Sequence, residues 1–133
     1  MKKISQILCI LLVSIVVVQC DSEKRAIHNK LTEMVQNLNE STPVMLDKYT
    51  RFDNAAVTNN NVFQYNYTVL NTQNPDSLIK NAESSLFENI RKEFETNPQL
   101  LFFKQNSVAV EYIYKDENGR LIHKIQLDSS NYN

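Results

Sequence analysis

Glycine, cysteine, histidine and tryptophan are scarce or absent in these 133 residues, and each shortage excludes a class of site. The only glycine, Gly119, cannot build a glycine-rich phosphate loop or a flexible linker. Cys9 and Cys20 both lie near the amino terminus, which does not suit a disulfide framework, a four-thiolate zinc site or a CxxC redox motif. With only two histidines as well, the sequence predicts no metal site and no cofactor.

The sequence also has no excess of charge of either sign. The 14 lysines and arginines nearly balance the 15 aspartates and glutamates, which gives a formal net charge of −1. Together with the absence of tryptophan, this balance argues against a dedicated nucleic-acid surface. The length leaves room for one domain, because a domain usually takes about 100–200 residues.

The amino-terminal segment has the layout of a secretory signal. Lys2 and Lys3 make a positive start, and an almost unbroken apolar run follows from Ile7 to Val18. Secretory signals carry an apolar region of about 7–15 residues. A membrane-spanning helix usually needs about 20 apolar residues, so this run is short for one.

The end of the apolar run, Val17-Val18-Gln19-Cys20, resembles the lipobox of bacterial lipoproteins. Gln19 replaces the usual small residue, but lipoproteins of the Bacteroidetes type accept a wider set there and often place acidic residues after the cysteine, as in Asp21 here. The resemblance implies a signal peptide over 1–19 and acyl chains such as palmitate on Cys20. It implies a lipid anchor to a bacterial membrane, with the outer membrane or cell surface favoured. A plain signal peptide, giving a secreted or periplasmic protein, and an uncleaved anchor remain as alternatives.

Residues 20–24 are then expected to form a short lipidated tether. Removal of the leader takes away Lys2 and Lys3 and leaves 12 basic residues against 15 acidic ones. A mildly acidic domain has no long-range attraction for anionic lipid or nucleic acid. The acyl chains, rather than the protein surface, are expected to hold the domain at the membrane.

Two stretches have apolar residues at helical spacing. The first predicts a helix over 23–39, which ends before Pro43, and the second predicts a helix from about Pro75 to 96. A short helical turn is expected at 100–103. The two apolar stripes consist of Ile27, Leu31, Met34, Val35 and Leu38, and of Ile79, Ala82, Leu86, Ile90 and Phe94.

Alternating apolar and polar residues predict four strands, over 44–57, 62–70, 108–115 and 121–127. Asn59-Asn60-Asn61 separates the first pair. Asn118-Gly119 separates the second pair and suits a turn with positive φ at both central residues. The order helix, strand, strand, helix, strand, strand predicts an α+β domain over 25–128, with a four-stranded antiparallel sheet packed against two helices. Residues 129–133 are expected to form a frayed tail.

The mature chain also resembles a family of small exported bacterial proteins with no assigned activity. The resemblance lies in the stretch from Pro43 to Arg51, in FQYNYTVLN, and in VEYIYKDENGRLIHKIQL. Many members carry a cysteine pair, one after the second helix and one at the carboxyl terminus, and this sequence has neither. The resemblance implies a secreted α+β domain and supplies no catalytic residue.

No known catalytic motif occurs, so the sequence predicts a protein that is not an enzyme. The tyrosines on the predicted strands suit cross-strand pairing. His123 shares a parity with apolar neighbours and is interpreted as structural, unless it pairs with His28 across the domain. The strand carboxylates are interpreted as members of solvated ion pairs. They are Asp47, Asp53 and Glu111.

Three functions remain open. The first is a non-enzymatic protein-binding module at the cell envelope, recognised by an exposed apolar patch or an open sheet edge. The second is a carrier of a small apolar ligand between the helices and the sheet. The third, a hydrolase, requires His123 within hydrogen-bond reach of a carboxylate. The expected lining of a ligand cavity is Phe63, Tyr65, Tyr67, Leu86, Ile90 and Val110.

Overall fold

The computed structural model describes the backbone of residues 2–131 and the side chains of residues 21–131. This part of the chain forms three α-helices, a 3₁₀ turn and a five-stranded mixed sheet. The helices are α1 (Lys2–Asn39), α2 (Pro75–Thr96) and α3 (Leu101–Gln105), and the 3₁₀ turn is η1 (Pro98–Leu100). The strands are β1 (Val44–Met45), β2 (Thr50–Val57), β3 (Phe63–Val69), β4 (Val110–Asp116) and β5 (Leu121–Leu127).

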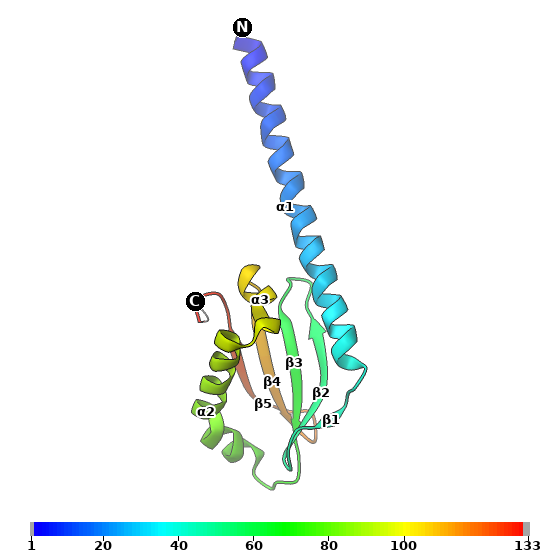
Figure 1. Ribbon diagram of the computed structural model, residues 1–133, viewed down its shortest axis with the longest axis vertical. Helices are drawn as coiled ribbons and strands as arrows, with labels where there is room; N and C mark the ends of the chain where they lie inside the picture. Colours follow the sequence, from blue (N-terminus) through cyan, green and yellow to red (C-terminus); the bar gives the residue numbers. More distant parts are fainter. Residues whose placement is uncertain (1, 132–133) are drawn as a thin grey trace.

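The α+β class and both predicted hairpins are confirmed. β2 pairs antiparallel with β3, and β4 pairs antiparallel with β5. The prediction of a fully antiparallel sheet is wrong, because β3 and β4 lie side by side in parallel. The reason is the connection: α2 carries the chain back along the sheet, so β4 starts at the same end as β3 (Figure 1).

The prediction of one strand over 44–57 is also wrong. Asp47 interrupts it, since its side chain accepts hydrogen bonds from the backbone N–H of Tyr49 (2.7 Å) and of Thr50 (2.9 Å). Such a side-chain turn competes with strand pairing. The chain therefore folds back, and β1 pairs antiparallel with β2 as a fifth, edge strand.

The prediction of two helices is one short. The short helical turn expected at 100–103 is η1 followed by a third helix, α3. Phe103 on α3 is fully buried, and its ring lies edge-on to Phe63 with the ring centres 5.1 Å apart. The Asn118-Gly119 turn is confirmed, but of these two residues only Gly119 has a positive φ, at 80°.

One face of the sheet carries the core. Phe63 and Val110 are directly paired on β3 and β4, and both are fully buried. Leu31 of α1 and Ile90 of α2 belong to the same core cluster. The opposite face is polar; there Glu111 accepts hydrogen bonds from Gln64 on one neighbouring strand and Lys124 on the other. The domain is therefore a two-layer α/β sandwich with helices on one face.

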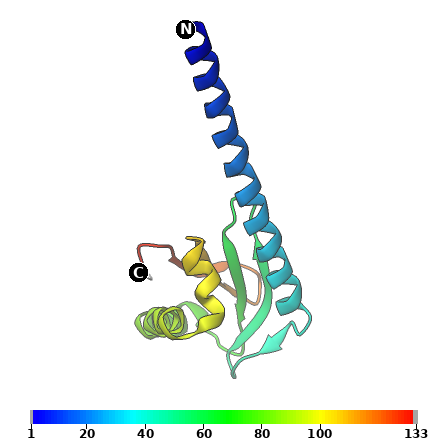
Figure 2. The same cartoon turned by 45° about the horizontal axis from the view of Figure 1, so that its top comes forward.

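α1 and α2 lie toward opposite edges of the same face of the sheet. α1 packs on β2 and α2 packs on β5, with β3 and β4 between them (Figure 1). α1 also projects well beyond the sheet, as both views show (Figures 1 and 2). Residues 21–24, expected to form a tether, lie within α1. The separation of α1 and α2 leaves part of the central strands uncovered.

Candidate functional site

A groove of about 690 Å³ lies beside α2 above the central strands. We call it the tyrosine groove. Tyr67 of β3 and Tyr112 and Tyr114 of β4 form its floor. One wall comes from α2, whose apolar stripe turns toward the sheet because its members recur every three or four residues. The remaining lining comes from the segment after β1. The wall residues are Leu78, Ile79, Ala82, Leu86 and Ile90 on α2, and Leu46, Asp47, Lys48, Tyr49 and Thr50 on that segment.

The floor is a stack of aromatic rings. Parallel pairing sets Tyr65 beside Tyr112 and Tyr67 beside Tyr114, and both ring pairs have centres 5.0 Å apart. Their planes are 18° and 16° from parallel, and the Tyr67 and Tyr112 rings continue the stack at 6.4 Å. Such ring pairs add stability beyond that of the apolar area they bury, so the ring stacking helps to hold the floor of the groove together.

The phenol hydroxyls of this stack stay protonated at physiological pH. Burial raises the pKa of both Tyr65 and Tyr114 to about 12. Burial also raises the pKa of Tyr67 and Tyr112, and the neighbouring phenols raise it further. The groove therefore offers neutral hydroxyl groups, each able to donate and accept a hydrogen bond, beside the apolar wall of α2.

Apolar surface continues from the groove onto the edge of the sheet. Leu46 lines the groove and is 57% exposed, and Val44, which pairs with Phe52 on the same face of the sheet, is 40% exposed. Met45, 46% exposed, points to the other face, because successive strand residues alternate. A binding surface that runs from the tyrosine groove to β1 is consistent with these exposures.

The expected cavity residues divide into two groups. Tyr67, Leu86 and Ile90 line the tyrosine groove, and Tyr65 belongs to the stack beside it. Phe63 and Val110 lie in the core with no exposed surface, so nothing can bind against them. Sequence reasoning did not assign Tyr112 and Tyr114 to the site, although their alternation on a strand was visible. Their meeting with β3 depends on the parallel pairing.

The other candidate residues have structural partners. His123 Nε2 lies 3.5 Å from Glu83 Oε1, an ion-pair distance beyond the usual hydrogen-bond range. His28 lies on α1, across the sheet from β5, and its Nδ1 is 2.8 Å from Asn61 Oδ1. Asp53 pairs with Arg51. Within residues 21–131 no cluster of three or more histidine, cysteine or acidic side chains is placed to hold a metal ion.

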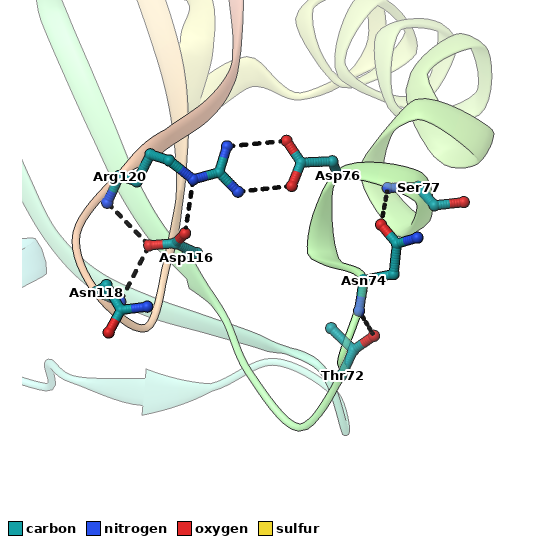
Figure 3. Close-up of polar contacts among 7 residues, drawn as sticks. All are labelled: Thr72, Asn74, Asp76, Ser77, Asp116, Asn118 and Arg120. Carbon is teal, nitrogen blue, oxygen red and sulfur yellow. Dashed lines mark hydrogen bonds and ion pairs between the residues drawn. The ribbon is translucent and has the colours of Figure 1, made fainter.

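A clasp of three charged residues fastens α2, the wall of the groove, to the β4–β5 turn. The Arg120 guanidinium donates to both carboxylate oxygens of Asp76, at 3.0 and 2.6 Å, and its Nε donates to Asp116 at 2.9 Å (Figure 3). Asn74 caps the same end of α2 by accepting from the Ser77 N–H at 3.1 Å. The Arg120 hydrogen bonds lower the pKa of the Asp76 carboxyl, and backbone donation from Arg120 lowers that of Asp116.

Replacing Arg120 with glutamine should reduce the loss of stability in acid. A carboxyl group whose pKa is lower in the folded state than in the unfolded state stabilises the fold fully at pH values above its unfolded pKa of about 4. This stabilisation is lost as the pH falls through the folded-state pKa. Urea midpoints between pH 7 and pH 3 should therefore fall less in Arg120→Gln than in the wild type. Lys92→Gln, which removes an exposed charge from α2, should keep the wild-type pH profile. Identical profiles for wild type and Arg120→Gln would show that the clasp contributes nothing.

Among residues 21–131, no helix is long and apolar enough to cross a membrane.

Comparison with known families gives one match. The model of "Domain of unknown function (DUF8479)" matches residues 25–123. No curated protein matches the chain.

Solved structures share the fold at low sequence identity. Secreted protein PA3611 from Pseudomonas aeruginosa is similar with a TM-score of 0.72 and 9% identity, over 83% of this chain and 96% of that one. EpsS, a pilotin of the Vibrio vulnificus type 2 secretion system, gives 0.67 and 8%, over 85% and 97%. AspS, a type II secretion system pilotin from Vibrio cholerae, gives 0.60 and 11%, over 83% and 96%. At these identities the likeness shows the fold alone.

Proposed function

Because the chain belongs to the DUF8479 family, a domain of unknown function, we propose its role from its own surface: it is a non-enzymatic protein-binding module of the bacterial cell envelope. The single observation that carries the proposal is the tyrosine groove, with its apolar wall from α2 and its floor of stacked tyrosine rings. Aromatic residues are enriched in protein interfaces because each contributes a large contact area and a polar tip.

The proposed occupant of the groove is an amphipathic helix of a partner protein. α1 and α2 flank the central strands and α3 lies over one end of them, so one further helix would complete the helical layer. A helix recognised in this way buries an apolar stripe at i, i+3, i+4 and i+7. The phenol hydroxyls of the floor would bond to small polar residues beside that stripe. The similar folds include pilotins of secretion systems and a secreted protein, which supports an envelope location.

Photo-crosslinking in intact envelopes tests the proposal. A crosslinking amino acid at Leu86, in the groove wall, should capture one protein of defined size. The matched control is Ser84, which lies two residues away on α2 and lines the separate hollow between α2 and β5. Ala82→Trp, which fills the groove, should reduce capture from position 86 about tenfold, corresponding to roughly 1.4 kcal/mol.

Two results would contradict this function. One is equal capture from positions 84 and 86. The other is unchanged capture by an Ala82→Trp protein whose unfolding midpoint matches the wild type.

A carrier of a small apolar ligand is the second candidate, and the size of the groove favours it. About 690 Å³ lies within the range of roughly 300–1,000 Å³ usual for small-molecule sites. Native mass spectrometry of protein purified from membranes separates the two. A bound small molecule of constant mass, absent from Ala82→Trp, would favour the carrier.

We also propose that acyl chains on Cys20 anchor the domain. Each buried methylene contributes about 0.8 kcal/mol, so two or more chains give lasting attachment. Cys20→Ala should move the protein from the membrane fraction to the soluble fraction and abolish palmitate labelling. A wild-type protein that carries no label or keeps its leader would contradict this anchor.

A further inference from the structure

A second hollow, of about 630 Å³, lies where α1 leaves the domain. It is polar, unlike the tyrosine groove, and we call it the basal hollow. Two turns of α1 and the β2–β3 turn form it, so residues far apart in sequence meet there. Its lining consists of Asp21, Lys24, Arg25, His28, Asn59, Asn60 and Asn61.

Hydrogen bonds hold the two sides of the basal hollow together. Asn61 Nδ2 donates to the backbone carbonyl of Lys24 at 3.0 Å, and Asn61 Oδ1 lies 2.8 Å from His28 Nδ1. Asn61 has a φ of 60°, a left-handed conformation that asparagine tolerates better than most residues. These contacts therefore hold the β2–β3 turn against α1 at the level of Lys24 and His28.

The cations of the basal hollow are available for an anion. Lys24 and Arg25 are both exposed. Among residues 21–131, no carboxylate makes an ion pair with either of them. The Arg25 Nε makes only a long bond, 3.4 Å, to the carbonyl of Asp21. The exposed amides of Asn59 and Asn60 add neutral donors, and the Asp21 carboxylate is the one acid in the lining.

The position of the basal hollow relative to Cys20 indicates which anion can reach it. α1 continues without a break through residues 20–28, and a helix rises about 1.5 Å per residue. Lys24 and Arg25 therefore lie roughly 6–8 Å from Cys20 along the helix axis. Headgroup regions of a bilayer have a similar depth, about 5–7 Å on each side. α3, with Leu101 48% exposed, lies at this same end of the domain (Figures 1 and 2).

We propose that the basal hollow binds the phosphate of anionic phospholipid headgroups and seats the domain upright on the bilayer. This rests on the proposed membrane attachment at Cys20. Lys24 and Arg25 supply the charge, and Asn59 supplies a neutral donor from the other side. The acidic domain has no long-range attraction to such a surface, so the contact forms only once the anchor has brought the two together.

Because the sequence has no tryptophan, single tryptophans can measure the contact. The full-length protein, processed in its host and purified from membranes, is reconstituted in phosphatidylethanolamine vesicles with and without phosphatidylglycerol. Asn60→Trp places an indole in the basal hollow, and Asn118→Trp places one in the β4–β5 turn at the opposite end (Figure 1). A nitroxide on the lipid headgroup should quench the indole at position 60 strongly and that at position 118 hardly at all.

Charge reversal then tests the residues. In the Asn60→Trp protein, Lys24→Glu with Arg25→Glu should abolish most of the quenching in phosphatidylglycerol vesicles. Lys80→Glu with Lys92→Glu makes the same charge change on exposed positions of α2 and should leave it unchanged. Equal quenching at positions 60 and 118, or equal loss in both reversal variants, overturns the basal contact. Failure of the wild-type protein to float with vesicles overturns the anchor itself, and the basal contact with it.

Discussion

Phe103→Ala should lower the free energy of unfolding by about 3–5 kcal/mol, the usual cost of removing a buried phenylalanine. Phe103 has no exposed surface, and its ring contacts Phe63 at 5.1 Å and Phe94 at 6.1 Å between centres. The side chain thus joins α3, β3 and α2 in one aromatic cluster. α3 has only five residues, too few to be stable alone, so its position depends on this contact.

Urea unfolding followed by circular dichroism measures this effect, and the same helix provides the control. Leu101 is 48% exposed, so Leu101→Ala should change stability by no more than about 0.5 kcal/mol. If both alanine variants lost similar stability, the contact of α3 with the core would not be the reason.

Asn39→Asp should cost about 2–4 kcal/mol, although the two side chains have nearly the same shape. The Asn39 amide makes a reciprocal pair with the backbone of Ala55: Nδ2 donates to the carbonyl at 3.0 Å, and Oδ1 accepts from the N–H at 2.7 Å. An aspartate can still accept, but it cannot donate, so the Ala55 carbonyl would face a carboxylate. This pair joins the end of α1 to β2.

The nearby Asn37→Asp offers a matched comparison. Asn37 is exposed on the same helix, so its replacement adds the same charge without removing a contact to β2. Its unfolding midpoint should stay near the wild-type value at pH 7. If Asn39→Asp lowered the unfolding midpoint as little as Asn37→Asp, the hydrogen bonds between Asn39 and Ala55 would not be what stabilises this end of α1.

Local patterns predict the elements of this fold well, because the periodicity of a helix or strand depends on residues a few positions apart. The stripe of Ile79, Leu86 and Ile90 predicts α2, and the alternation around Tyr112 predicts β4. The order of strands in the sheet depends on the path of the chain after Thr96, and no local pattern records that path. The parallel pairing of β3 with β4 was therefore missed.

The candidate site shows the same limit. Tyr67, Leu86 and Ile90 were predicted to line an enclosed ligand cavity because each lies on an apolar face, and in the structure they line the open tyrosine groove. Phe63 and Val110 carry the same pattern but are fully buried by α3 and the neighbouring strands. An apolar face predicts which residues are covered by protein. It does not show whether the covering residues belong to the same chain or to a partner.

The parallel seam between β3 and β4 also has a consequence for the timing of folding. It joins Phe63 to Val110 and Val69 to Asp116, so partners on this seam are separated by about a third of the polypeptide. Contacts between such distant residues form late, since a large loop must close first. The sheet can be completed only after most of the chain has been synthesised, because β4 and β5 both lie in its last quarter.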